Sequence, residues 1–304
     1  MIKPRLVAVV AAKGLGDGLI SCVLSHHLQL AGHKVTTFNT ALCPLSKWFP
    51  EHTLRPFPSL EEITTIFSPF DQIIAFDHSL LSESTQFPDK LMVLREHAFD
   101  KRQTLVENLS RFAFNTFSSP LSLNKNGITP REGLHHKKYP QRVVIHPMST
   151  DPDRTWPKKK FLLLAKKLVH KGYQPVFLMC PLERACWKDV NPDWISPLSS
   201  LDETAAYIYE SGYLIGNNSG LGHLASNLGI PTLSLFSRMS YARLWRPGFG
   251  NNRVVTPYPL LLGARWKQKY WKELLTVGRV MDSFCQLVHA QAQKGEEEIS
   301  LLLK

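Results

Sequence analysis

The sequence has little of several features that would narrow its class at once. Its five cysteines are scattered and odd in number, so they form neither a disulfide framework nor a zinc-knuckle spacing. Its 17 glycines form no triplet repeat, which excludes a collagen-like fibre. No apolar run is long enough to span a membrane, and the first residues lack the long apolar region of a signal peptide. We therefore expect reduced thiols and a cytoplasmic protein, which could still contact the inner face of the membrane.

Acidic residues are scarce relative to basic ones. The chain has 25 Asp and Glu against 36 Lys and Arg, a net charge of +11, while 43% hydrophobic residues are typical of a globular protein. Such an excess calls for an acidic partner: nucleic acid, anionic lipid or a phosphorylated substrate. The excess lies in residues 131–171 and 238–279, each with a net charge of +8. The chain shows no helix-turn-helix, zinc finger or aromatic-rich RNA motif, so nucleic acid is not the partner that we expect.

Each basic segment allows more than one interpretation. The lysines of the first segment fit the solvated face of a helix, which is the usual place for surface lysines. Members of the second segment could instead face an anionic lipid acceptor or the membrane itself. The first set is Lys158, Lys159, Lys160, Lys166, Lys167 and Lys171, and the second is Arg238, Arg243, Arg246, Arg265, Lys267 and Lys269.

The order of apolar runs and turns predicts an α/β protein with two similar halves. Short strands alternate with helical patterns, and the loops between them are short, as in a parallel sheet. Residues 118–141 carry Ser, Pro, Asn and Gly without apolar periodicity and indicate a linker. We expect a first domain at 1–130, followed by the linker to about 141, and a second domain at 142–304, whose last helix could pack back on the first. The predicted strands are 5–11, 34–38, 71–76, 142–146, 174–179, 212–215, 232–236 and 253–256; the predicted helices are 19–31, 101–117, 158–170, 202–210, 219–228 and 267–293.

A glycine-rich loop follows the first predicted strand. Open α/β sheets bind ligands beyond the carboxyl ends of their strands, so such loops are where chemistry is expected. The spacing is neither that of a dinucleotide fingerprint nor that of a Walker loop. Asp17 has two interpretations, an N-cap of the following helix or a catalytic base. The loop consists of Lys13, Gly14, Leu15, Gly16, Asp17 and Gly18.

A second candidate loop follows the strand that ends at His146. Ser149 and Thr150 offer hydroxyl donors there, and Arg154 offers a planar cation suited to phosphate. Asp151 and Asp153 form a D-x-D pair, which could hold a divalent metal. The intervening proline and the adjoining Arg154 favour a capping turn with an ion pair.

A third loop opens a helix after the strand at 212–215. Free backbone N–H groups and the helix dipole make such a position suitable for a diphosphate. A lone histidine on a helix is more often structural, but the neighbouring glycines favour a ligand-facing His223. The loop reads Asn217, Asn218, Ser219, Gly220, Leu221, Gly222 and His223.

These three loops, in this order, resemble glycosyltransferase family 9, which includes the lipopolysaccharide heptosyltransferases. The most specific part is the stretch from Asn218 to Ala225, continued by Gly229, Ile230 and Pro231. The resemblance implies a GT-B fold, two Rossmann-like doubly wound domains facing across a cleft, with the acceptor mainly on the first and the nucleotide-sugar mainly on the second. It also implies an inverting transfer without a metal or other cofactor, from a nucleotide-diphosphate sugar such as ADP-heptose to an anionic glycolipid or glycan acceptor such as the lipopolysaccharide core.

The resemblance also implies roles for single residues. Asp17 would be the catalytic base, and the rest of its loop (Lys13, Gly14, Gly16 and Gly18) would lie on the acceptor side. Asn218 and Glu183 would contact the donor sugar or ribose. The donor diphosphate would be held by Ser149, Thr150, Arg154, Ser219, Gly220, Leu221, Gly222 and His223.

The chain also departs from the family pattern. Many heptosyltransferases have an aspartate where this chain has Asn218, so the donor sugar is less defined than the reaction class. Two alternatives therefore stay open beside the transferase: a nucleotide-sugar epimerase of the same fold and a catalytically degenerate scaffold protein.

Overall fold

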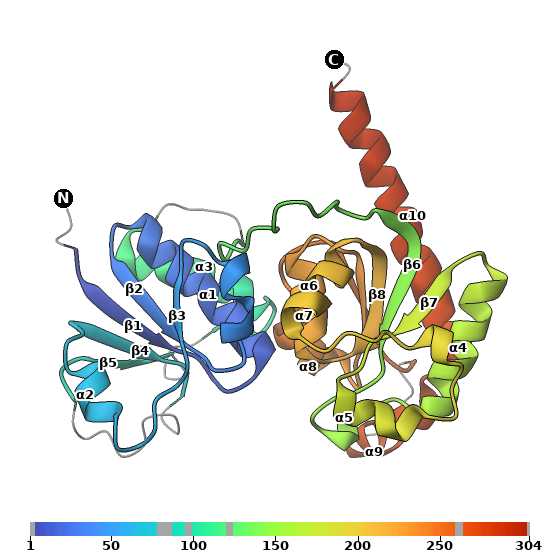
Figure 1. Cartoon of the computed structure of the whole chain (residues 1–304), viewed down its shortest axis with the longest axis horizontal. Coiled ribbons are helices and arrows are strands. Elements are labelled where there is room, and N and C mark those ends of the chain that lie inside the picture. The colour runs from blue at the N-terminus through green and yellow to red at the C-terminus, as the bar shows by residue number, and fades with distance from the viewer. Residues whose placement is uncertain (1–3, 78–86, 95–98, 120–123, 259–263, 303–304) are drawn as a thin grey trace. The chain divides into compact units, whose positions relative to one another are not determined.

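The chain forms two compact units, residues 1–131 and 132–304, each built around its own parallel sheet (Figure 1). The structure is a computed structural model. It describes residues 4–77, 87–94, 99–119, 124–258 and 264–302, without the side chains of 264–268 and 295–302. Within the described residues, no helix is both long enough and apolar enough to cross a membrane.

The first unit contains a five-stranded sheet in the order β3-β2-β1-β4-β5. The chain fills one side of β1 first and then crosses to the other side, so the order reverses between β1 and β4. Ligands bind at such reversal points, just beyond the carboxyl ends of the strands. The strands are β1 (Leu6–Val10), β2 (Lys34–Phe38), β3 (Thr53–Arg55), β4 (Gln72–Ala75) and β5 (Leu91–Val93).

Helices cover this first sheet. Helix α1 (Leu15–Leu30) packs on β1 and β2 and lies beside α3 (Leu105–Phe117). A short helix α2 (Ile63–Phe67) and a 3-10 helix (Cys43–Trp48) complete the unit. Part of the core consists of aromatic rings, in which Phe38, Phe67 and Phe70 pack in edge or tilted contacts.

The second unit contains a five-stranded parallel sheet in the order β7-β6-β8-β9-β10. Here the order reverses between β6 and β8, which places the loops after these two strands at the expected ligand position. The strands are β6 (Tyr139–His146), β7 (Gln174–Phe177), β8 (Ser211–Asn217), β9 (Thr232–Leu235) and β10 (Asn252–Val255).

Helices lie on both faces of the second sheet. Figure 1 shows α6 and α7 on one side and α4 and α10 on the other. The core beneath α4 and α10 includes the fully buried rings of Trp156, Phe161 and Phe177. The helices are α4 (Lys158–His170), α5 (Pro181–Arg184), α6 (Leu201–Tyr209), α7 (Gly220–Asn227), α8 (Met239–Trp245), α9 (Ala264–Leu274) and α10 (Val277–Leu302).

Several predicted element limits are wrong. Helix α1 begins at Leu15 rather than at residue 19, because Gly14 is already the extended N-cap. Helix α3 begins at Leu105 rather than at 101, because Thr104 and Glu107 form a capping box that sets the start. Strand β6 begins at Tyr139, so the end of the predicted linker is strand. The packing of the last helix on the first domain stays a prediction.

The predicted last helix is in fact two helices, and one lysine of the first basic segment lies at the break. The ammonium of Lys160 donates to the carbonyls of Lys272, Glu273 and Leu275 at 2.6, 2.9 and 3.0 Å. It therefore satisfies carbonyls at the C-terminus of α9, where a cation is favoured. The prediction of a solvated face is wrong for Lys160, whereas Lys159, Lys166, Lys167 and Lys171 are exposed.

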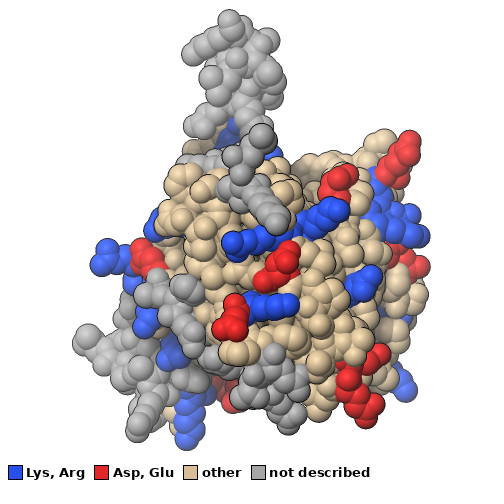
Figure 2. Space-filling model, turned by 90° about the vertical axis from the view of Figure 1, so that its left-hand side faces the viewer, with Lys and Arg blue, Asp and Glu red and all other residues tan. Residues whose placement is uncertain are grey.

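Charged side chains are mixed on the face of the molecule that Figure 2 shows. Lysine and arginine alternate there with aspartate and glutamate, among a larger area of uncharged residues. The described surface on this side therefore offers no broad basic patch of the kind that nucleic acid requires.

Candidate functional site

The candidate site is built where the strand order of the second unit reverses. His146 ends β6 and pairs in register with Gly216 of β8. A Cβ on Gly216 would lie 2.9 Å from the carbonyl oxygen of His146, so glycine permits the close approach of the two strands. The loops that follow β6 and β8 therefore start side by side.

A buried asparagine ties these two loops together. The Asn217 side chain accepts a hydrogen bond from the Trp156 backbone N–H at 3.0 Å and donates to the Pro147 carbonyl at 2.7 Å. Only 1% of Asn217 is exposed, and both ends of its amide are satisfied. The sequence motifs predict no ligand contact for Asn217, although an amide at the end of an apolar strand is a signal of such a role.

The loop after β6 contains the capping turn and the ion pair predicted for it. The Asp151 carboxylate accepts a hydrogen bond from the Asp153 backbone N–H at 2.9 Å. Its other oxygen lies 3.0 Å from Nε of Arg154. The turn is a 3-10 helix at Pro152–Arg154. Asp151 therefore acts as a cap and as the partner of Arg154.

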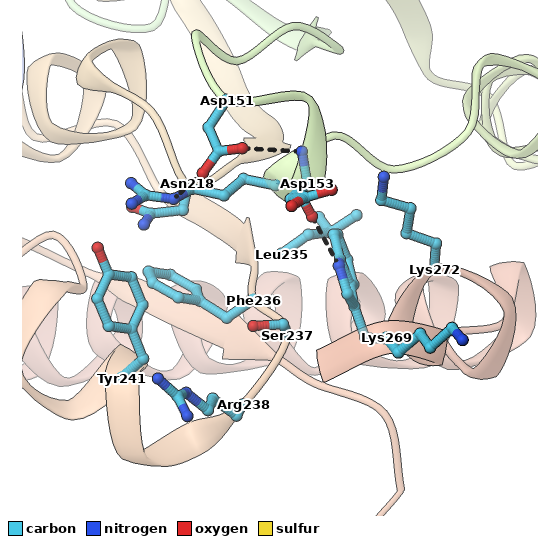
Figure 3. A pocket seen from close by; sticks show the side chains of 12 residues that line it. Asp151, Asp153, Asn218, Leu235, Phe236, Ser237, Arg238, Tyr241, Lys269 and Lys272 are labelled. Carbon is cyan, nitrogen blue, oxygen red and sulfur yellow. Dashed lines mark hydrogen bonds and ion pairs between the residues drawn. The ribbon is translucent and has the colours of Figure 1, made fainter. Parts of the chain in front are cut away.

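A pocket of about 520 Å³ opens beside this turn (Figure 3). Its walls come from the loops after β6 and β8, from the end of β9 with the start of α8, and from α9. The lining side chains include four cations and two carboxylates, so the pocket is polar and suits an anionic ligand. The residues are Asp151, Asp153, Arg154, Asn218, Leu235, Phe236, Ser237, Arg238, Tyr241, Lys269, Trp271 and Lys272.

Aromatic rings and backbone contacts hold the pocket walls. The guanidinium of Arg154 lies over the Tyr241 ring, 5.4 Å from its centroid. The Trp271 indole N–H donates to the Asp153 carbonyl at 2.9 Å, and the Lys272 ammonium donates to the Pro152 carbonyl at 2.8 Å. Helix α9 is thus fastened to the turn that presents Arg154.

The pocket includes only part of the predicted site. Arg154 and Asn218 line it, and so do three cations of the second basic segment, Arg238, Lys269 and Lys272. The side chains of Arg265 and Lys267 lie outside the described residues. Sequence reasoning missed the end of β9 and helix α8 as pocket walls, since the stretch from Leu235 to Tyr241 contains no glycine-rich pattern. The predicted residues outside the lining are Ser149, Thr150, Glu183, Ser219, Gly220, Leu221, Gly222 and His223.

Most of these remaining residues lie on the loops after β6 and β8 or at the start of α7, whereas Glu183 lies on α5, which follows β7. Ser219 is the N-cap of α7, and its hydroxyl is 2.9 Å from Nδ1 of His146. Glu183 is at the start of α5, where its carboxylate accepts from the Cys180 N–H at 2.8 Å. Ser149 accepts a long contact from the Asp151 N–H at 3.4 Å. Their predicted contacts with a donor stay predictions.

Two buried histidines flank the start of α7. Burial lowers the pKa of His223 to about 4, and its Nδ1 has no hydrogen-bond partner in the described structure. Burial also lowers the pKa of His146 to about 4, while the negative charge of Glu183 acts in the opposite direction. Both imidazoles are therefore neutral near pH 7.

The glycine-rich loop of the first unit has a different local structure. Gly14 is the N-cap of α1, so the N-cap interpretation of Asp17 is wrong; Asp17 lies in the first helical turn. Its carboxylate folds back over Gly14, where a Cβ would meet Oδ2 at 2.5 Å. Lys13 and Gly14 are exposed, whereas Gly18 is buried against Asn39. The role of Asp17 as a catalytic base stays a prediction.

Two units of the Rossmann type, each with a parallel sheet and a glycine-rich switch-point loop, define a glycosyltransferase fold of the GT-B class. Residues 74–256 match the family model "Glycosyltransferase family 9 (heptosyltransferase)". This match covers more than half of the chain, so the protein belongs to glycosyltransferase family 9, as its motifs predicted. Comparison of the sequence with curated proteins gives no match.

Solved structures confirm the fold. The E. coli ADP-heptose lps heptosyltransferase II is 19% identical, with 94% of this chain and 99% of that chain covered and a TM-score of 0.68. E. coli heptosyltransferase WaaC with ADP is 16% identical, with 93% and 99% covered and a TM-score of 0.66. The iron-containing dodecameric glycosyltransferase TibC of enterotoxigenic E. coli H10407 is 13% identical, with 95% and 78% covered and a TM-score of 0.59.

Proposed function

We propose that this protein is an inverting transferase that moves heptose, or a related sugar, from ADP-heptose to an anionic glycan such as the lipopolysaccharide core. The observation that carries the proposal is the pocket at the switch point of the second unit, where Arg154 and Asn218 meet. Membership of the heptosyltransferase family and the ADP in a similar solved structure support the choice of donor.

In the proposed reaction the acceptor oxygen attacks the anomeric carbon while the bond from that carbon to the diphosphate breaks. Asp17 takes the proton of the acceptor hydroxyl. The charge that develops on the leaving diphosphate is met by Arg154, by the hydroxyls of Ser149 and Thr150, and by the N-terminus of α7. Such preorganised groups are worth roughly 3–4 kcal/mol of barrier for a single oxyanion donor.

Two exposed cations of the pocket, Arg238 and Lys269, favour an anionic acceptor. Arg238 is exposed, and the part of the chain that the structure describes gives it no ion-pair partner. Lys269 is exposed on α9 and lies over the neighbouring Tyr270 ring, 5.4 Å from its centroid. We assign these two cations to a phosphate or carboxylate of the acceptor, because Arg154 is assigned to the donor.

Ligand-induced stabilisation tests the donor assignment. A thermal-shift panel of ADP, UDP, GDP, CDP and ADP-heptose should give the largest rise in melting temperature with the adenine ligands. A larger rise with UDP or GDP would overturn the assignment of the base.

Metal independence is tested separately. Sugar transfer should persist after the protein is treated with EDTA and desalted. If transfer were lost by this treatment and recovered on adding iron, metal independence would be overturned.

A further inference from the structure

The N-cap of α7 is occupied by a serine that does not cap the helix. Ser219 has extended backbone angles, φ −150° and ψ 166°, as an N-cap residue should. Its hydroxyl nevertheless accepts no hydrogen bond from the helix backbone. The hydroxyl lies instead 2.9 Å from Nδ1 of His146, at the end of β6.

This arrangement deprives α7 of the stabilisation that a side-chain N-cap provides. A serine side chain at an N-cap ordinarily satisfies one of the free N–H groups of the first turn and stabilises the helix. The histidine that diverts the hydroxyl is itself positioned by the close approach of β6 to β8 at Gly216. The residues from Asn218 to Leu221 remain half-exposed, so a ligand can reach the helix start.

We propose that His146 is a positioning residue, which holds the Ser219 hydroxyl away from α7 and so keeps the first-turn N–H groups open for the donor diphosphate. This inference rests on the proposed function, since it supposes that a nucleotide diphosphate binds here. None of the sequence motifs gave His146 a role. A second observation points to the same place: the buried Nδ1 of His223, on the first turn of α7, has no hydrogen-bond partner among the described residues.

A neutral histidine suits this task. Burial keeps the His146 imidazole uncharged near pH 7, so it holds the hydroxyl by a hydrogen bond without offering a cation that would compete with Arg154. With the proton on Nδ1, the imidazole donates to Ser219, and the serine O–H is left to donate to a phosphate oxygen.

Two amide substitutions separate this role from a merely structural one. In His146→Asn the amide occupies the position of Nδ1 and can keep the contact with Ser219. In His146→Gln the amide occupies the position of Nε2, so the contact is lost while size and polarity are similar. Each change is made in the parent protein and in the Ser219→Ala background, which has no hydroxyl to divert.

The first unit provides a matched control. Nδ1 of His27 lies 2.9 Å from the Ser119 hydroxyl, and both residues are buried. This pair has the same chemistry and the same length but lies outside the donor-binding unit. His27→Gln should therefore lower stability without changing the affinity for ADP.

ADP titration by calorimetry gives the result. We expect His146→Gln to weaken ADP binding about fivefold, because a freed N-cap hydroxyl stabilises the closed helix end by about 1 kcal/mol. His146→Asn should bind like the parent, and His146→Gln should have no further effect in the Ser219→Ala background. An equal loss in both backgrounds, or no loss in either, would overturn the positioning role. No ADP binding by the parent protein would remove the proposed function and this inference with it.

Discussion

The switch-point loops of the two units use the same device for different ends. In each, an asparagine at or just after a strand end fastens the loop: Asn39 donates to the Ala12 carbonyl at 2.6 Å, and Asn217 donates to the Pro147 carbonyl at 2.7 Å. In the first unit, the protein's own side chains occupy the space over Gly14 and Gly18. In the second, the tied loops border a pocket of about 520 Å³.

We infer from this difference a division of work between the units. In the proposed reaction, the loop that Asp17 fills presents a carboxylate to the acceptor, whereas the loop that is tied at its base and open above binds the donor. Variants that change one unit alone test this division of work.

The largest expected effect is on turnover. Asp17→Asn keeps the shape of the side chain over Gly14 but removes the base, so kcat should fall by about a hundredfold or more. The measurement is release of ADP from ADP-heptose with a truncated lipopolysaccharide core as acceptor. ADP affinity should not change, and a variant that retains parental turnover would refute the base assignment.

The next effect is on stability in acid. His146 and His223 have folded pKa values of about 4, below the ordinary value of 6.5, so the unfolded chain binds more protons between these limits. The free energy of unfolding therefore has its full value above pH 6.5 and falls as the pH drops toward 4. At pH 5 the loss is about 2 kcal/mol for each histidine. Urea unfolding at pH 7 and pH 5 measures the loss, and equal stability at both would contradict the burial of neutral imidazoles.

The paired asparagines give the sharpest contrast between the units. Asn217→Ala leaves the buried Trp156 N–H without its partner and should cost about 2–4 kcal/mol, with loss of ADP binding. Asn39→Ala removes contacts to Ala12 and Leu42 and should cost a similar amount, with ADP affinity intact. Urea unfolding and ADP titration of both variants test this, and weakened ADP binding by the Asn39 variant would count against separate tasks.

The sequence predicted most of what local chemistry determines. β-branched runs located eight of the ten strands of the described residues, and the glycine-rich loop after the strand at 212–215 located Asn218 and Ser219. Arg154 was predicted as the planar cation of the loop after His146, which contains no glycine. The short strands β3 and β5 were missed, since three residues carry no readable period. The contribution of Arg238, Tyr241 and Lys272 to the pocket depends on tertiary packing, which brings β9, α8 and α9 to the turn after β6. The hydrogen bonds that His146 and Asn217 make between the loops after β6 and β8 depend on the register of these two strands. No local sequence pattern contains that register.

Binding of ADP by Arg154 variants tests the central claim most directly. The Arg154 guanidinium, which lies over Tyr241, should neutralise part of the negative charge of the diphosphate. Arg154→Gln should therefore weaken ADP binding about tenfold in calorimetry. Arg142→Gln is the matched control, since Arg142 lies over the Tyr139 and Tyr207 rings and outside the pocket. We expect parental ADP affinity for the Arg142 variant and a tenfold loss for the Arg154 variant. Equal affinities for ADP in all three proteins would refute the assignment of Arg154 to the donor diphosphate.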